Sequence, residues 1–392
     1  MTINRATSLL IFFLYSISIA GVAKKTILSD TLEYSPWSFS ELIISYPNQF
    51  IRRGLIGELA TIFDSNLVLF DTINIFIFIN FIIFIILSNV HFKLSNFNSL
   101  QHFLYMISIF GVFNISIFNH YYQRKEMFVL NLFLISLLVI RTKLSNYTVF
   151  ITMSLTSILM ILIHEGIAMI TIPFLVFISK NKISNFRNLL KVYTAIILST
   201  FLIVIISAGN ESASTELWQG LSEFDRSLIY IEPNAITAIG WSLFDSFFIT
   251  TRVLIFSGYM FLWIFYFLIL ALTLLVIFKD GFQNLSFDLS AIKIFLKNNK
   301  YFLVIPILFI VGFDWGRWIF ALFHLCFFTF MMFYKNNASF IKKWTPTIFI
   351  FITVSMLTIM PECCLNMSGT PVSSNYFRIF KSMQITILSL FS

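Results

Sequence analysis

The sequence predicts an all-α membrane protein, a polytopic bundle of transmembrane helices. Of the 392 residues, 58% are hydrophobic and only 11% are charged, whereas soluble domains average about 25% charged residues. The apolar residues also come in continuous runs, and a membrane-spanning helix needs about 17–25 of them. A β-barrel is excluded, because its strands would alternate apolar and polar side chains.

The apolar runs predict about eleven spans within a single integral membrane domain, residues 1–392. The first run follows Arg5 and is similar to a secretory signal, but further spans follow it, so an uncleaved helix is expected. An amphipathic segment from Arg378 to Phe391 fits either a twelfth span or an interfacial helix. The eleven spans are expected near 6–22, 72–90, 101–118, 127–140, 147–163, 166–179, 191–208, 253–278, 301–313, 317–334 and 346–360.

The distribution of charge predicts a cytoplasmic N-terminus. In that orientation the inner segments carry fifteen Lys and Arg and only two Asp and Glu. The outer segments carry the other eleven Lys and Arg and the other sixteen Asp and Glu, in agreement with the net charge of +8. Positive residues concentrate on the cytoplasmic side of membrane proteins. These basic residues lie in short loops, so binding to nucleic acid is not expected. Two longer loops, near 23–71 and 209–252, are expected on the periplasmic side.

The stretch YPNQFIRRGLIGEL, residues 46–59, lies in the first outer loop. Its apolar residues recur at helical spacing, which predicts an interfacial helix that carries Arg52 and Arg53. The planar guanidinium fork binds phosphate through two parallel hydrogen bonds, so both arginines are candidates for binding a substrate diphosphate. Unspecific contact with anionic lipid headgroups is the alternative.

The stretch HYYQRKEMF, residues 120–128, places Arg124 and Lys125 where an outer loop becomes a helix. The positive end of a helix favours acidic side chains, so an anion near these two bases would relieve the conflict. Both are therefore further candidates for binding the diphosphate. A plain membrane anchor is the alternative, since tyrosines and basic residues are common at membrane interfaces.

His164 and Glu165, in IHEG, join two predicted spans with almost no loop between them. Either side chain is a candidate general base for a hydroxyl proton, and a water-satisfied polar turn is the alternative. The sequence contains no HExxH motif, and the other four histidines are not at ligand spacing. No metal site and no cofactor are therefore expected.

GFDWGRW, residues 312–318, lies between two strongly apolar runs. Asp314 and Arg317 are three residues apart, so they share one helix face. Arg317 is a candidate phosphate clamp, and Asp314 is a candidate for orienting it or for acting as a base. Trp315 and Trp318 offer flat surfaces for a sugar ring. A local ion pair with an interfacial aromatic belt is the alternative.

The loop 209–252 combines several acidic residues with Trp218 and Trp241. Carboxylates accept hydrogen bonds from sugar hydroxyls and aromatic faces cover the apolar side of the ring, so these tryptophans are candidates for binding sugar. A simple solvated loop is equally consistent with the composition. The sequence has no Walker lysine loop, which excludes ATP as the driving force. No span carries a line of ionisable residues, so a proton-coupled transporter is not favoured.

These outer-face residues suit a lipid-linked sugar diphosphate at the headgroup plane. Guanidiniums fixed near the leaving diphosphate would stabilise its growing negative charge, and a metal would not be obligatory. A base, with Glu165, His164 and Asp314 as the candidates, would accept the proton of the attacking hydroxyl.

The chain resembles the Wzy-type O-antigen and capsule polymerases, which are GT-C-like membrane glycosyltransferases. The resemblance is architectural: the size, the number of spans, the long outer loop and the Phe- and Ile-rich, Ala-poor composition. It implies a bacterial inner-membrane enzyme that joins undecaprenyl-diphosphate-linked repeat units on the periplasmic face. A chain-length regulator would be a candidate partner, besides the bilayer. The arginine-x10-glycine pattern of some members is missing here, so no catalytic residue is carried over.

Three alternatives stay open. A GT-C glycosyltransferase with a polyprenyl-phosphate donor would share the outer-face site, and its acidic residue near the end of the first span would correspond loosely to Asp30. An O-antigen ligase would also share the site. A repeat-unit flippase belongs to another class and would need basic residues along a central cavity within the spans, whereas this sequence keeps them at the span ends.

Overall fold

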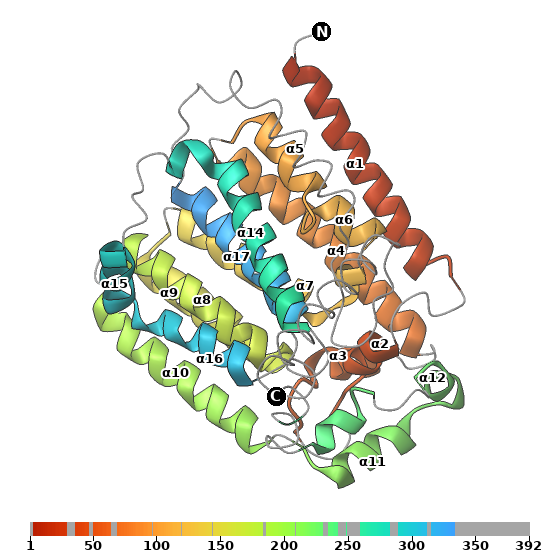
Figure 1. The fold of residues 1–392 in the computed structure, drawn as a ribbon. Coiled ribbons are helices and arrows are strands. Elements are labelled where there is room, and N and C mark those ends of the chain that lie inside the picture. The colour runs from red at the N-terminus through yellow and green to blue at the C-terminus, as the bar shows by residue number, and fades with distance from the viewer. Residues whose placement is uncertain are drawn as a thin grey trace, which may run out of the picture. The chain divides into compact units, whose positions relative to one another are not determined.

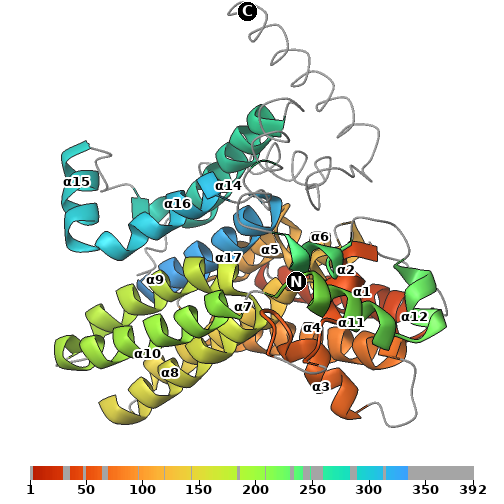
Figure 2. The ribbon, with the colours of Figure 1, turned by 90° about the horizontal axis from the view of Figure 1, so that it is seen from below.

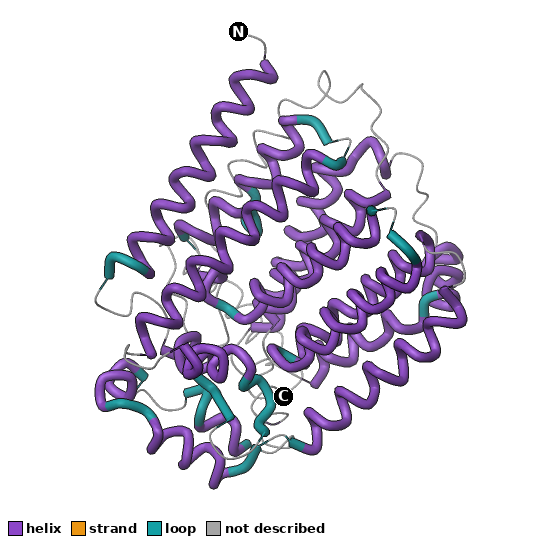
Figure 3. Tube along the Cα trace, turned by 180° about the vertical axis from the view of Figure 1, so that it is seen from behind, coloured by secondary structure: helices purple, strands orange, loops and turns teal. Residues whose placement is uncertain are grey.

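In the computed structural model, every regular element among the described residues is a helix (Figure 3). The all-α prediction is therefore confirmed for this part of the chain. The structure describes residues 3–29, 36–46, 50–63, 69–95, 97–118, 120–142, 144–182, 186–207, 209–229, 234–241, 248, 259–282, 289–311 and 315–333. The predicted span 346–360 and the segment 378–391 lie outside these ranges, as do Asp30, Cys363 and Cys364.

Six of the described helices are long and apolar enough to cross a membrane, by length and composition. They comprise Ala6–Thr26, Leu69–Lys93, Ser99–Ile117, Asn146–Ile163, Leu189–Ile206 and Trp315–Phe333. Two shorter apolar helices cover Trp263–Phe278 and Lys300–Phe309. The chain is accordingly a multi-pass membrane protein.

The chain divides into two compact units, and two of the four divisions fall within the long helices α1 and α4. The first unit comprises Met1–Ile19, Asn89–Tyr121 and Asp245–Ser392, and the second comprises Ala20–Ser88 and Tyr122–Phe244. Helix α1 covers Ile3–Thr26 and α4 covers Leu69–Lys93.

The second unit contains a bundle of four helices that pack side by side (Figures 1 and 2). They are α7 (Lys125–Arg141), α8 (Asn146–Ile163), α9 (Glu165–Lys182) and α10 (Phe186–Ile206). Hydroxyl groups join neighbouring helices: Ser136 to Thr156 at 2.7 Å and Ser157 to Tyr193 at 2.6 Å, oxygen to oxygen. Such bonds suit an apolar bundle, because a polar group that faces lipid tails would find no hydrogen-bond partner there.

Short helices of the second unit form its predicted outer loops. They are α2 (Pro36–Leu42), α3 (Leu55–Phe63), α11 (Glu211–Gly220), α12 (Glu223–Leu228) and the 3₁₀ helix η2 (Thr237–Gly240). The 3₁₀ helix η1 (His120–Gln123) contains the division between the units after Tyr121. Residue Gly57 of α3 lets this helix approach the chain after α2, because a Cβ there would lie 2.1 Å from the carbonyl oxygen of Ile44. The carboxylate of Glu58 accepts a hydrogen bond from the Tyr46 N–H at 2.9 Å and ties the same two segments.

The first unit has an aromatic core. Its helices are the N-terminal part of α1, α5 (Ser99–Ile107), α6 (Val112–Ile117), α14 (Tyr259–Phe282), α15 (Leu289–Asn298), α16 (Val304–Val311) and α17 (Trp315–Phe333), with the 3₁₀ helix η4 (Lys300–Leu303). Tyr105 of α5 stacks on Phe327 of α17 with ring centroids 4.4 Å apart, and Phe92 stacks on His102 at 3.7 Å. Ring stacking of this kind stabilises helix contacts beyond simple burial.

The predicted span 101–118 is interrupted. Its two halves, α5 and α6, are separated at Ser108–Gly111. The Asn114 amide donates to the carbonyls of Ile107 and Ser108, at 2.9 and 2.8 Å, and so replaces helical bonds. A Cβ at Gly111 would lie 2.0 Å from the Tyr105 carbonyl oxygen, so the turn needs glycine there. Periodicity alone did not predict this break, because both halves are apolar.

Candidate functional site

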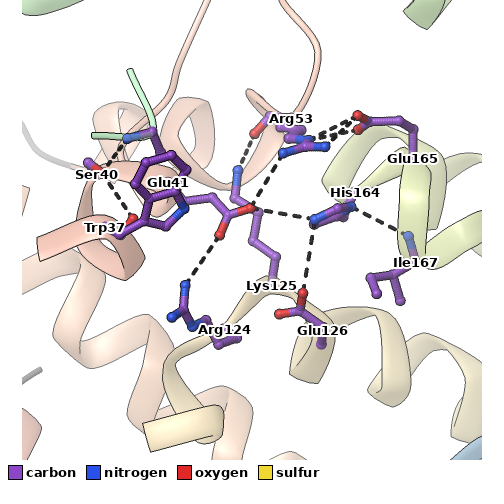
Figure 4. Close-up of polar contacts among 11 residues, drawn as sticks. Trp37, Ser40, Glu41, Arg53, Arg124, Lys125, Glu126, His164, Glu165 and Ile167 are labelled. Atoms are coloured by element: carbon purple, nitrogen blue, oxygen red, sulfur yellow. Dashed lines mark hydrogen bonds and ion pairs between the residues drawn. The ribbon is translucent and has the colours of Figure 1, made fainter. Parts of the chain in front are cut away.

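Seven ionisable side chains gather at one end of the bundle in the second unit (Figure 4). They come from α2, from the turn before α3, from the start of α7 and from the junction between α8 and α9. We call them the charged cluster: Glu41, Arg53, Arg124, Lys125, Glu126, His164 and Glu165. All but Arg53 and Glu165 are almost fully buried, and the side chains of these two are 29% and 16% exposed.

Arg53 and Glu165 form a two-pronged ion pair at the more accessible side of the charged cluster. The Arg53 Nε lies 3.0 Å from each carboxylate oxygen of Glu165, and the Arg53 NH2 nitrogen lies 2.8 Å from Oε1. A guanidinium can bind a phosphate through paired hydrogen bonds of the same kind.

The Glu41 carboxylate lies at the centre of the charged cluster (Figure 4). Its Oε1 is 3.9 Å from a terminal nitrogen of Arg53 and 3.5 Å from Nε2 of His164, and its Oε2 is 3.9 Å from a terminal nitrogen of Arg124. A carboxylate that is only 2% exposed is costly to ionise without such partners. Glu41 is also an anion beside Arg124, the residue before α7.

The imidazole ring of His164 lies between the carboxylates of Glu41 and Glu126. Its Nδ1 accepts a hydrogen bond from the Ile167 N–H at 3.4 Å, which favours the neutral tautomer with the proton on Nε2. That Nε2–H faces Glu41 at 3.5 Å and Glu126 at 4.0 Å. The ring is therefore arranged to donate toward Glu41.

The side chain of Lys125 contacts a backbone carbonyl rather than solvent. It is completely buried, and its ammonium donates to the carbonyl oxygen of Arg53. Arg53 has a φ of 66°, in the left-handed region that costs a non-glycine residue about 1–2 kcal/mol. The N–H of the preceding residue, Arg52, donates to the Ser207 carbonyl at 3.1 Å and fixes the other side of the turn. Lys125 thus positions Arg53.

Two pKa shifts follow from the charges around this turn. Burial acts to raise the pKa of Glu165, but the charge and hydrogen bonds of Arg53, with the charge of Arg52, outweigh it and hold the pKa below its ordinary value. Burial, and then the charge of Arg53, lowers the pKa of Arg52, which Glu165 opposes. Glu165 is therefore an ionised carboxylate and a weak base while Arg53 holds it.

Basic groups outnumber carboxylates here. The charged cluster holds three bases, Arg53, Arg124 and Lys125, and three glutamates, and the adjoining Arg52 adds a fourth base near Glu165. Helices α7 and α9 also begin at the charged cluster, and helix N-termini carry partial positive charge. The arrangement can bind an added anion, and it holds carboxylates that can accept a proton. Among the described residues, no three His, Cys, Asp or Glu side chains are placed to hold a metal ion.

The structure brings five of the sequence-predicted residues together. Arg53, Arg124, Lys125, His164 and Glu165 lie in the charged cluster, and Arg52 adjoins it. One prediction about them is wrong: Arg52 and Arg53 do not lie on the helix, since α3 begins at Leu55. Arg53 instead lies in a left-handed turn, which hydrogen bonds with Lys125 and Ser207 hold in place. The turn keeps both arginines out of the helix that follows.

The remaining predicted residues lie elsewhere. Arg317, Trp315 and Trp318 belong to the first unit, where both tryptophan rings pack edge-on against Phe309, with centroids 5.6 and 5.1 Å apart. Asp314 lies outside the described residues.

The predicted sugar-binding tryptophans of the long outer loop lie in the second unit. Trp218 is on α11 and Trp241 follows η2, and both are half-buried.

Sequence reasoning missed Glu41, Glu126 and Trp37. The signal for Glu41 was a single acidic residue within the apolar run FSELII, residues 39–44. A lone carboxylate in such a run predicts a buried charge, and buried charges near a membrane are functional candidates.

Searches for related proteins return no match, either among protein families, among curated proteins or among solved structures.

Proposed function

We propose that this chain is a membrane glycosyltransferase whose sugar donor is linked to a polyprenyl diphosphate, and specifically an O-antigen polymerase. The observation that supports the proposal best is the charged cluster with the adjoining Arg52, where four basic groups and three carboxylates gather at the end of an apolar helix bundle. Buried ion pairs add little stability on average, so a cluster of this size suggests chemistry rather than scaffolding.

The proposal includes a topology of eleven spans with a cytoplasmic N-terminus. In that topology the loops that carry α2, α3 and α11 face the periplasm, and so does the charged cluster. Lipid-linked repeat units present their diphosphates at this level of the inner membrane. The excess of Lys and Arg in the inner loops supports this orientation.

In the proposed reaction the acceptor hydroxyl attacks the anomeric carbon of the donor sugar. The bond from that carbon to the phosphate oxygen breaks, and the lipid diphosphate leaves with the electron pair. Arg53 and Arg124 stabilise the charge that develops on the leaving oxygen. The phosphate competes with Glu165 for the fork of Arg53.

Glu41 is the best-placed proton acceptor for the attacking hydroxyl. Glu165 is the weaker candidate, because Arg53 holds it ionised and lowers its pKa. His164 donates toward Glu41 and fixes its carboxylate, which makes the histidine a positioning residue in this scheme. Lys125 acts through the backbone of Arg53.

A second candidate function is a GT-C glycosyltransferase with a polyprenyl-phosphate donor. The specific observation in its favour is Glu41, a buried carboxylate in the loop that follows the first span. This type of enzyme carries an acidic residue in that region. An O-antigen ligase would use the same cluster with another acceptor, whereas a flippase would need basic residues within the spans.

The experiment that tests the function is a lipopolysaccharide gel from a strain lacking this gene. A core band with one repeat unit and no ladder above it is expected, because only polymerisation would be lost. A bare core without a repeat unit would reject the polymerase and leave the glycosyltransferase, the ligase or the flippase. An unchanged ladder would reject all of them.

A further inference from the structure

We infer that Trp37 and Trp241 form a sugar-binding subsite beside the charged cluster, and that it takes a neutral pyranose of the lipid-linked glycan. The inference rests on the proposed function and deepens it. Trp37 lies on α2 and Trp241 follows η2, with ring centroids 6.4 Å apart and planes tilted by 48°. Both side chains are half-buried, so each indole keeps an accessible part.

The two tryptophans are held by hydrogen bonds between their segments. Ser40 Oγ donates to the Trp37 carbonyl at 2.9 Å and accepts from the Ala235 N–H at 3.0 Å, so one hydroxyl joins α2 to the chain that leads to Trp241 (Figure 4). That chain is itself fixed, because Ser214 of α11 donates to the Ile236 carbonyl at 2.9 Å. A surface held in this way loses little freedom when a ligand binds.

Trp37 also shares a face of α2 with the centre of the charged cluster. It lies four residues before Glu41, a spacing that places two side chains one above the other on a helix. Figure 4 shows the indole alongside the Glu41 side chain. A sugar stacked on Trp37 would thus lie one helical turn from the proposed base.

The Trp37–Trp241 pair carries no charge of its own, unlike the charged cluster. Aromatic faces suit the apolar side of a sugar ring, whereas the guanidiniums of Arg53 and Arg124 suit a phosphate. In the proposed donor, the diphosphate would therefore bind at the charged cluster and the glycan at the tryptophans.

The subsite is tested by binding of small probes to the full chain in nanodiscs. Saturation-transfer NMR with methyl pyranosides of glucose, galactose, mannose and N-acetylglucosamine measures sugar binding. Calorimetry with inorganic pyrophosphate measures anion binding at the charged cluster. Trp37→Ala and Trp241→Ala are each expected to weaken glycoside binding at least about tenfold, since each removes one stacking face. Trp37→Phe keeps a ring and is expected to bind within about threefold of the original chain.

Tyr147→Ala is the matched control, because this exposed ring at the start of α8 lies outside the pair and outside the charged cluster. It should bind glycosides as the original chain does, and all four variants should bind pyrophosphate normally. The subsite is rejected if Trp37→Ala and Trp241→Ala bind glycosides normally, or if no glycoside binds a chain that binds pyrophosphate. Tryptophan-dependent glycoside binding without pyrophosphate binding would uphold the subsite and reject the diphosphate donor.

Discussion

Arg53 combines a left-handed backbone with a guanidinium fork that closes on Glu165, and both features depend on its neighbours. The buried ammonium of Lys125 caps its carbonyl. Glu165 fills the fork. A residue held this tightly in a costly conformation, at the accessible side of a buried cluster, fits a binding role better than a purely structural one.

Arg53→Lys is expected to lower the transfer rate by at least about tenfold, because lysine keeps the charge but loses the two parallel hydrogen bonds. The measurement is ladder formation, or product release from a lipid-linked donor, in a complemented strain. Arg226→Lys on α12 is the matched control and should leave the rate unchanged. Full activity of Arg53→Lys would show that the fork is not used.

Lys125→Met is expected to destabilise the protein by about 1–3 kcal/mol, because it leaves the Arg53 carbonyl without this donor in a buried site. Thermal unfolding in detergent measures the change. The same loss is expected in an Arg53→Gly background, because the carbonyl of residue 53 remains and still lacks its donor. Unchanged unfolding temperatures for Lys125→Met would contradict the role of Lys125.

Glu165 links stability to pH. Its pKa is lower in the folded chain than in the unfolded one, so its contribution is complete above the unfolded pKa and is lost as the pH falls through the folded value. The original chain should therefore lose thermal stability below about pH 4, relative to Glu165→Gln. Parallel melting temperatures for both chains from neutral to acidic pH would contradict this account.

At the scale of elements, the site depends on the close approach of α3 to the chain after α2. Gly57→Ala would place a Cβ 2.1 Å from the Ile44 carbonyl oxygen, a backbone atom that cannot turn aside. A loss of about 1–3 kcal/mol is expected from the overpacking, measured by thermal unfolding. Gly220→Ala is the control, because its Cβ would meet nothing within 4 Å, and it should not destabilise.

The helices themselves were largely predictable, and the breaks between them were less so. Apolar runs gave α8 to within one residue, but the true start of α10 lies five residues before the predicted one, at Phe186. Helical periodicity extended a helix over Arg52 and Arg53, where the backbone N–H of Arg52 and the side-chain ammonium of Lys125 make hydrogen bonds that hold a turn instead. Such bonds join residues far apart in the sequence, so local patterns do not reveal them.

The same limit applies to the site. The sequence singled out Arg53 on a predicted interfacial helix, and Arg124 and His164 at predicted span ends, and the structure brings them together. Glu41 went unnoticed because nothing in its own segment shows that it would meet them. Its three partners come from three other parts of the chain, so only the tertiary fold reveals the centre of the cluster.

At the scale of the whole molecule, the account requires the charged cluster to face the periplasm. In a chain whose native cysteines are replaced by serine, Gln219→Cys on α11 should react with a membrane-impermeant maleimide in intact spheroplasts. Thr142→Cys, at the end of α7, should react only after lysis. Both side chains are exposed, so access rather than burial decides the outcome. The reverse labelling pattern would overturn the proposed orientation.

The most direct test of the central claim is the lipopolysaccharide ladder of a gene-deleted strain that carries Glu41→Gln. The amide keeps the size of the side chain and removes its capacity to accept a proton at neutral pH. With normal amounts of the protein in the membrane, the account predicts a core with one repeat unit and no ladder. A full ladder would mean that the charged cluster around Glu41 is not the catalytic centre.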